Sequence, residues 1–281
     1  KVQISVTGLD RLRSDPYQFY AGSILNLRSV DGLDAEPSPA WKGTAVHEIL
    51  DRWHKAGDPS GGLRDIAVQV LDEMSAHPLM RSLWRPRLMA ALDWIDQQIA
   101  ALGNEEDRKV LTSEVWGGME VRGIRIHGRA DRIDRLGGGG LAIVDYKTGG
   151  PPTRSMVKQG YSLQLGVIGL IALADGFENV SGTPTEFEYW SLAKDPRRRE
   201  ENGFGYVASP FKTSRADGLE KEEFLAVTER FLNEAIDDWI LGDKPFTARL
   251  NPDIGGFNDY DQLMRLDEWL PHLGSDEKAK T

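Results

Sequence analysis

The sequence predicts an α/β protein with a mixed central sheet flanked by helices and with short helical segments added at the N-terminus. Strand-like runs rich in β-branched residues, joined by glycine turns, fill residues 109–136 and 141–149. Amphipathic helical periodicity precedes these runs over residues 39–102 and returns over residues 153–173 and 221–241. A block of strands between blocks of helices predicts a sheet covered by helices.

The N-terminal residues predict short elements and a linker. Residues 4–25 are typical of a helix capped at Thr7, a break at Pro16 and a second short helix with aromatic side chains facing inward. Residues 29–39 are polar and contain prolines, which is typical of a linker. A longer helix is expected over residues 39–55.

The helix expected over residues 39–55 carries a buried apolar stripe, with His47 beside it. The stripe consists of Val46, Ile49, Leu50 and Trp53. Residues 63–76 and 79–102 predict two further amphipathic helices. A helical block therefore precedes the strands.

The elements after the first strands are expected to cover and extend the sheet. Residues 153–173 predict one helix, and residues 185–193 predict a further strand that leads into an arginine-rich loop. A last long helix is expected over residues 221–241, followed by an irregular tail. No internal repeat is visible.

Composition bounds the possible chemistry. The 281 residues, 40% of them hydrophobic, suffice to bury a core as one large domain or two small ones. The chain has no cysteine, which excludes disulfides, thiolate zinc sites, iron–sulfur clusters and cysteine nucleophiles. Any metal must therefore bind to oxygen or imidazole.

The apolar run at residues 163–174 is too short to span a bilayer, and no N-terminal signal pattern precedes it. We therefore expect a cytoplasmic protein that does not enter a membrane. Because the chain begins at Lys1 rather than Met, we also expect it to be a fragment of a longer protein or a processed product.

The formal net charge of −10 argues against nucleic-acid binding by general positive charge alone. Local basic groups could still meet phosphates, although a solvated surface is the simpler interpretation. These groups are Arg81, Arg85 and Arg87, and residues 197–199.

The stretch GRADRIDRLGGGGLAIVDYKTG, residues 128–149, places charged residues in expected strands. The period of two puts Asp145 and Lys147 on one sheet face. If the glycine-rich connection is an odd-numbered loop with Leu136 opposite Gly140, Asp131 falls opposite Asp145 on that face, whereas an even-numbered loop turns it away. Two close carboxylates repel unless a cation or proton compensates, so their pairing beside a lysine predicts a divalent-metal site. The alternative is exposed acids in ion pairs with Arg129 or Arg132.

Four motifs in order raise the weight of the metal-site interpretation. They are GTAVH ending at His47, GRAD ending at Asp131, VDYKTG containing Asp145 and Lys147, and QL at Gln164. This pattern resembles the PD-(D/E)XK nuclease superfamily and, within it, the RecB-like exonucleases.

The resemblance implies a set of site residues. His47, Asp131 and Asp145 would be metal ligands, joined by the backbone carbonyl of Tyr146. Lys147 would be catalytic together with the two aspartates, and the ion would be Mg²⁺, with Mn²⁺ tolerated because imidazole is a ligand.

Two further residues are candidate contributors to this site. Glu114 lies on the preceding strand and is otherwise a solvent-facing residue. Gln164 lies on the following helix and is otherwise part of the core.

The two ends of the chain resemble the flanks of the C-terminal nuclease domain of AddB proteins, subunits of bacterial AddAB helicase–nucleases. Many AddB proteins carry an iron–sulfur cluster whose first cysteine precedes the proline of the opening segment; here that position is Asp15, so no cluster is expected. Packing must then join the ends. The available residues are Tyr17, Phe19, Tyr20, Tyr260, Leu263 and Trp269.

The resemblance implies one nuclease domain over residues 1–281, with a core at 39–245, a helical insertion at about 60–103, and N-terminal and C-terminal segments at 1–38 and 246–281. Its function would be that of a divalent-metal-dependent DNA exonuclease within an AddAB-type helicase–nuclease, in double-strand-break repair and recombination. DNA, an AddA-like helicase–nuclease subunit and the rest of its own chain would be the partners. The alternatives are a catalytically silent nuclease-fold module for DNA binding or assembly, and a free-standing RecB-like exonuclease. No G-x-x-x-x-G-K-[S/T] pattern occurs, so any ATP use would belong to another segment or a partner.

Overall fold

The protein is described by a computed structural model, which covers residues 2–28, 39–57, 61–74, 84–105, 107–198, 203–213 and 216–248, together with Tyr260 and Leu263. The strands are β1 (Gln3–Ser5), β2 (Lys109–Val121), β3 (Ile124–Arg135), β4 (Leu141–Lys147), β5 (Pro184–Lys194) and β6 (Phe204–Ala208). The α-helices are α1 (Val6–Ser14), α2 (Pro16–Phe19), α3 (Pro39–Lys55), α4 (Leu63–Glu73), α6 (Arg85–Glu105), α7 (Arg154–Lys158), α8 (Gln164–Leu173) and α9 (Phe224–Ala235). Short π-helical and 3₁₀ turns are η1 (Tyr20–Ile24), η2 (Lys221–Glu223) and η3 (Ile236–Ile240).

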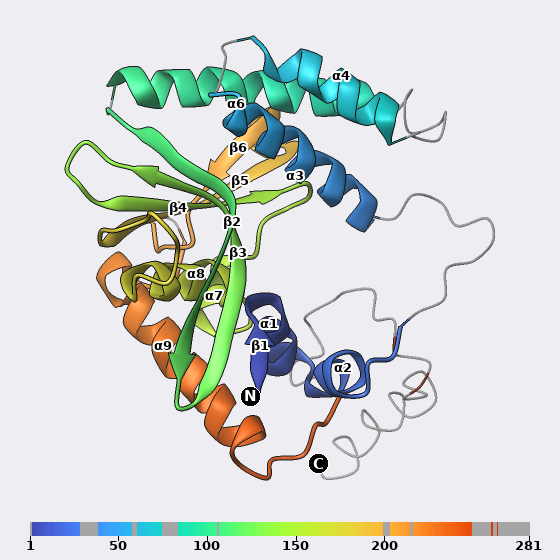
Figure 1. The fold of residues 1–281 in the computed structure, drawn as a ribbon, viewed down its shortest axis with the longest axis vertical. Coiled ribbons are helices and arrows are strands. Elements are labelled where there is room, and N and C mark those ends of the chain that lie inside the picture. The colour runs from blue at the N-terminus through green and yellow to red at the C-terminus, as the bar shows by residue number, and fades with distance from the viewer. Residues whose placement is uncertain are drawn as a thin grey trace, which may run out of the picture.

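The strands form one mixed sheet, as the sequence predicts, with β3 at its centre (Figure 1). Along one edge β3 pairs antiparallel with β2 over most of its length. Along the other edge it pairs first in parallel with β1 and then antiparallel with β4. The sheet continues through β5, parallel to β4, and ends at β6.

Helices cover both faces of the sheet. One core joins α1, α8 and α9 to side chains such as Ile133 and Ile143, and a second joins α3, α4 and α6 to Val144 and Trp190. Figure 1 shows the two helix groups on opposite sides of the sheet. Because β4 is buried on both faces, its first four residues, 141–144, are all apolar instead of alternating.

The glycine-rich connection between β3 and β4 is the odd-numbered loop that the site requires. Leu136 donates its N–H to the carbonyl of Gly140, at 3.0 Å, and the ladder pairs Arg132 with Val144. One residue pair further along, the same register places Asp131 opposite Asp145.

Several local details differ from the expectation. The cap of α1 is Ser5 instead of Thr7, because the Ser5 hydroxyl accepts the N–H of Gly8 at 3.0 Å. The single helix expected over residues 153–173 is two helices, α7 and α8, and the break lies at Gly160, whose φ is +74°. A side chain at Gly160 would collide with the ring of Phe231, so packing reinforces this break.

The helix expected over residues 79–102 runs over Arg85–Glu105 in the described part. Strands β1 and β6 were not expected from the sequence. Residues 29–38 of the predicted linker at 29–39 lie outside the described residues, as do Arg81, Arg199 and Trp269. Within the described residues, no helix has the length and apolar character needed to cross a membrane.

The two ends of the described chain meet around Phe246. Its ring stacks on Phe19 at 6.3 Å between centroids and lies 5.4 Å from the ring of Tyr20. The Tyr17 N–H donates to the carbonyl of Thr247 at 3.1 Å. Aromatic packing between the ends is therefore present, although its central residue was not among those expected.

Further along the tail, the Tyr260 hydroxyl donates to the carbonyl of Leu27 at 2.9 Å. Leu263, by contrast, is 59% exposed. Of the two described tail residues expected to tie the ends together, only Tyr260 does so through a hydrogen bond.

Replacing Phe246 with Ala is expected to loosen the N-terminal segment, because aromatic contacts with Phe19 and Tyr20 are lost. We expect a loss of roughly 1–2 kcal/mol in the free energy of unfolding. Limited trypsin digestion should then cut faster at Arg11. Leu173→Ala, at a residue that is 50% exposed, is the control. Unchanged cleavage in Phe246→Ala would show that the two ends are independent.

Candidate active site

Three side chains from different elements meet at one point beside the sheet. They are His47 of α3, Glu114 of β2 and Asp131 of β3. His47 Nδ1 lies 2.7 Å from Glu114 Oε1 and 3.7 Å from Asp131 Oδ1. One donor atom from each residue lies within 4.8 Å of the other two. Imidazole and carboxylate donors at this spacing fit Mg²⁺ or Mn²⁺.

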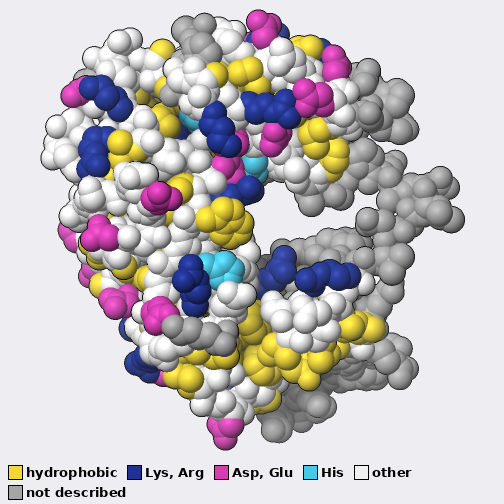
Figure 2. All heavy atoms as spheres, in the orientation of Figure 1, with side chains coloured by type: hydrophobic (Ala, Val, Ile, Leu, Met, Phe, Trp, Pro, Cys, Tyr) yellow, Lys and Arg dark blue, Asp and Glu magenta, His cyan; other side chains and the backbone are white. Residues whose placement is uncertain are grey.

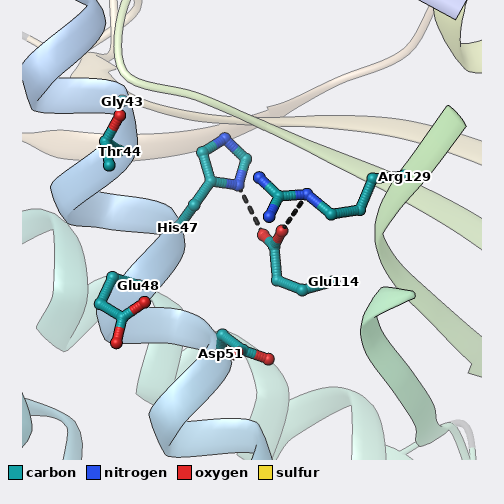
Figure 3. Close-up of a pocket in the computed structure, with 7 residues that line it drawn as sticks. All are labelled: Gly43, Thr44, His47, Glu48, Asp51, Glu114 and Arg129. Atoms are coloured by element: carbon teal, nitrogen blue, oxygen red, sulfur yellow. Dashed lines mark hydrogen bonds and ion pairs between the residues drawn. The ribbon is translucent and has the colours of Figure 1, made fainter. Parts of the chain in front are cut away.

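Glu114 reaches this cluster through an unusual backbone conformation. Its φ is +48°, within a strand, although the β2–β3 register runs unshifted from Ser113 to Val115 on either side of it. A left-handed conformation costs a residue with a side chain about 1–2 kcal/mol, and such outliers gather at functional sites. One carboxylate oxygen contacts His47, and the other lies 2.7 Å from Arg129 Nε (Figure 3).

Asp131 and Asp145 are both buried where their strands run side by side. The Asp131 carboxylate accepts the backbone N–H of Tyr146 at 2.8 Å. Burial, with a further contribution from the charge of Asp145, raises the pKa of Asp131 to about 7. A cation placed here would favour the ionised form.

The described residues do not show the alternative in which the acids form ion pairs with Arg129 or Arg132. Arg129 forms its ion pair with Glu114. Arg132 is fully buried, pairs with Asp134 at 2.9 Å, and lies over the ring of Trp190. Neither arginine forms an ion pair with Asp131 or Asp145 in the described part of the chain.

Lys147 is held between two side chains. Its Nζ lies 2.8 Å from Asp145 Oδ2 and donates to Gln164 Oε1 at 3.2 Å. Burial favours the neutral amine, but the charge and hydrogen bond of Asp145 outweigh it, so the pKa of Lys147 is above its ordinary value. The side chain is therefore an ammonium group directed at the acidic site.

A pocket of about 300 Å³ opens beside the cluster (Figure 3). It is lined by Gly43, Thr44, His47, Glu48, Asp51, Glu114 and Arg129. A side chain at Gly43 would meet nothing within 4 Å, so this glycine leaves the approach to His47 open. His47 and Glu114, two of the three clustered donors, therefore face open space.

The sequence matches the family described as the PD-(D/E)XK nuclease superfamily over residues 3–251. The chain belongs to this superfamily. The mixed sheet flanked by helices is consistent with the core of that superfamily. Superfamily membership suggests a phosphodiesterase.

Two relatives that the chain matches share 30% or less of the aligned residues with it. An uncharacterized protein of Rickettsia bellii is 30% identical over 191 residues, which are 63% of this chain and 22% of that protein. A protein of Lactococcus lactis that is named as a subunit of an ATP-dependent helicase/deoxyribonuclease is 23% identical over 164 residues, which are 53% of this chain and 15% of that protein. The chain thus spans about a fifth or less of the length of these relatives.

A solved structure from Eubacterium rectale is 13% identical to the chain and aligns with a TM-score of 0.42. The alignment covers 89% of this chain and 85% of that structure.

The structure brings some of the predicted site residues together, and its cluster of donors differs from the predicted ligand set in one member. His47 and Asp131 belong to the cluster of donors, and the third member is Glu114, which the sequence marked only as a candidate contributor. Asp145 lies outside this cluster in the described residues and pairs with Lys147. Gln164 contacts Lys147, and the role of the Tyr146 carbonyl stays a prediction.

Asp10 of α1 is a residue of this nuclease fold that sequence reasoning missed. Its carboxylate accepts the N–H of Leu163 at 2.6 Å, immediately before α8. Burial raises the pKa of Asp10 to about 7, and the charge of Lys147 acts in the opposite direction. Asp10 thus caps the helix whose first residue, Gln164, contacts Lys147. No local pattern links positions so far apart in the chain.

A buried charged network lies behind the site. Arg132 donates to the Tyr146 hydroxyl at 2.7 Å. Arg108 pairs with Asp134 at 2.7 Å and with Glu188 at 2.8 Å. These contacts join β3, β4 and β5, the strands that carry or flank the two buried aspartates.

Replacing Asp131 with Asn is expected to stabilise the metal-free nuclease fold at neutral pH. Because the folded-state pKa of about 7 lies above the ordinary value, the stability that protonation of Asp131 contributes is fully present below about pH 4 and is lost as the pH rises from about 4 to 7. The Asn side chain of the variant carries no charge, so the fold no longer bears the free-energy cost of a buried ionised carboxylate. The free energy of unfolding should therefore rise by roughly 1–3 kcal/mol at pH 8.

Urea unfolding with a chelator present, at pH 5 and pH 8, measures this difference. The advantage of Asp131→Asn should grow with pH. Asp243→Asn, at an exposed position, is the control and should show no such trend. An Asp131→Asn protein less stable than wild type at pH 8 would contradict the argument.

Proposed function

We propose that the chain is a divalent-metal-dependent DNA exonuclease domain that hydrolyses phosphodiester bonds. The observation that carries this proposal is the meeting of His47, Glu114 and Asp131 beside the Asp145–Lys147 pair. Buried like charges are costly in a purely structural site, whereas a metal-dependent hydrolase needs them.

His47, Glu114 and Asp131 would hold the ion. Asp145 and the backbone carbonyl of Tyr146 would lie next to it. Mg²⁺ or Mn²⁺ bound there would neutralise the phosphate and supply an activated water. Protonated His47 has a pKa above its ordinary value, because its hydrogen bond to Glu114 and the nearby carboxylates outweigh burial. Its proton therefore competes with the ion, and we expect ion binding to strengthen as the pH rises.

Lys147 would act on the reacting phosphate. Its ammonium group offsets the negative charge that builds in the transition state and orients the attacking water. Asp145 and Gln164 fix the direction of this group from two sides. Asp10 supports Gln164 through the start of α8. Each of these residues thus has a distinct task in one phosphoryl-transfer site.

The proposed cellular setting comes from one named relative. The relative from Lactococcus lactis is named as a helicase/deoxyribonuclease subunit, and this chain corresponds to 15% of its length. We propose that the chain is the nuclease portion of such a subunit. It would act on DNA with an AddA-like helicase–nuclease partner in double-strand-break repair and recombination.

Incubation of the chain with end-labelled linear DNA and with circular DNA, with and without Mg²⁺ or Mn²⁺, tests the activity. We expect ion-dependent release of nucleotides from linear ends and no cutting of circles. DNA binding without cleavage under all conditions would favour a silent nuclease-fold module. Cleavage together with failure to bind an AddA-like subunit would favour a free-standing exonuclease.

A further inference from the structure

Trp116 of β2 stands out on the surface. Its side chain is 64% exposed, more than any other large hydrophobic residue in the described part of the chain. All other described tryptophans are buried or half-buried. A single exposed apolar residue is common, so the surroundings of Trp116 decide whether it has a function.

The surroundings of Trp116 are basic and aromatic. The His127 ring lies 6.2 Å from the indole at an angle of 29°, and the Arg129 guanidinium lies 6.0 Å from it. Figure 2 shows hydrophobic, histidine and basic side chains gathered at the hollowed side of the molecule.

The surface formed by Trp116, His127 and Arg129 adjoins the proposed active site. The Arg129 side chain that approaches Trp116 also lies 2.7 Å from Glu114 of the donor cluster. Contacts therefore run from Glu114 through Arg129 and Trp116 to His127. A ligand seated on Trp116 would be next to the site of cleavage.

A second pocket, of about 430 Å³, opens at the far side of Trp116. It is lined by Gln3, Trp116, Gly117, Gly118, Arg125, His127, Gly176 and Glu178. Its glycines expose backbone to the pocket, and its size is sufficient for a planar group stacked on the indole.

The backbone that carries Trp116 is fixed on both sides. The ladder pairs Trp116 with Arg129. The N–H of Gly118 donates to the carbonyl of Gly176 at 3.0 Å, and Gly117 forms a bridge with Phe177. A side chain at Gly117 would collide with the Phe177 ring, so β2 lies close against the segment that carries Gly176 and Phe177. A platform held in this way loses little conformational freedom when a ligand binds.

We propose that Trp116, His127 and Arg125 form a subsite for an unpaired DNA strand, with a base stacked on the Trp116 indole. Stacking on an aromatic side chain needs an exposed base face, which a paired duplex hides within its own stack. Arg125, which is exposed at the pocket, would meet a backbone phosphate. The proposal rests on the proposed function and adds to it that the strand is single near the site.

Binding of two labelled oligonucleotides of equal length tests the subsite. One is oligothymidylate, and the other carries abasic residues, so it has the phosphates without the bases. Fluorescence anisotropy with Ca²⁺ in place of Mg²⁺ gives the Kd of each. Trp116→Ala should weaken binding of oligothymidylate about 10-fold, with less than a twofold effect on the abasic strand. Trp116→Phe should retain most of the affinity.

Two further variants separate stacking from charge. Arg125→Gln should weaken both oligonucleotides equally and lower the salt dependence of binding by about one phosphate contact. Leu111→Ala, on the same strand and outside the pocket, should behave as wild type. Circular dichroism of each variant checks the fold.

An unchanged Kd for oligothymidylate in Trp116→Ala, or an equal loss on the abasic strand, would overturn the subsite. If wild type cuts DNA and Trp116→Ala cuts with an unchanged KM, the subsite fails and the proposed function stands. If wild type binds oligothymidylate through Trp116 and cuts nothing, the proposed function fails and the subsite stands. A wild type that binds neither oligonucleotide overturns the subsite, and cleavage of linear DNA then decides the proposed function separately.

Discussion

Asp145→Asn is expected to abolish metal-dependent DNA cleavage, with a loss of roughly 10³-fold or more in single-turnover rate. The change keeps the shape of the side chain and removes a buried negative charge that lies 2.8 Å from Lys147. Without that charge Lys147 loses its fixed position, and the attraction of the site for a divalent ion decreases. Because Asp145 lies outside the cluster of three closest donors, ion affinity should fall by about 10- to 100-fold instead of disappearing.

Calorimetric titration with Mn²⁺ beside a single-turnover cleavage assay measures both effects. Asp243→Asn, at an exposed aspartate, is the matched control and should bind and cut as wild type. An Asp145→Asn protein that cuts as fast as wild type would remove Asp145 from the site.

Lys147→Ala is expected to separate ion binding from catalysis. The ammonium group repels a cation, so its removal should leave Mn²⁺ affinity unchanged or increase it. Cleavage should still fall by roughly 10²- to 10⁴-fold, because charge on the reacting phosphate is no longer offset. DNA affinity should persist, since most of it comes from phosphate contacts spread over the surface.

The same pair of measurements, calorimetry and single-turnover cleavage, applies to Lys147→Ala. Lys158→Ala, at a lysine whose ion pair with Asp217 is on the surface, is the control. Loss of Mn²⁺ binding in Lys147→Ala would show that the lysine holds the site together and does not act on the phosphate. Cleavage at the wild-type rate would exclude a catalytic role.

The centre of the fold could be predicted because its signals are local. The period of two along β4 places Asp145 and Lys147 on one face, whereas the register that puts Asp131 opposite Asp145 depends on a loop length that the sequence left open and the structure supplies. The apolar stripe of α3 fixes the face beside which His47 lies. In each case, a short stretch of sequence determines where its own side chains point.

The remaining features depend on contacts between distant segments. Strand β1 has three residues and is defined by its pairing with β3, so its own sequence carries little signal. The break before α8 needs both Gly160 and the ring of Phe231. Asp10 acts on Leu163 across most of the chain. None of these relations has a periodic signature.

Glu114 shows most clearly what could not be predicted from the sequence. The sequence places it on a strand, where regular alternation would decide which face it joins. The structure instead gives it a left-handed backbone and brings its carboxylate to His47. Such a conformation is imposed by the surrounding chain, so the residue could be marked only as a candidate contributor.

The central claim is that His47, Glu114 and Asp131 hold a divalent ion beside Asp145 and Lys147. Anomalous diffraction at the manganese absorption edge, from crystals of the chain grown with Mn²⁺, tests it most directly. The account predicts a peak within about 2.0–2.6 Å of donor atoms of His47, Glu114 and Asp131. Crystals that show ordered Mn²⁺ elsewhere on the molecule and none among these three side chains would contradict it.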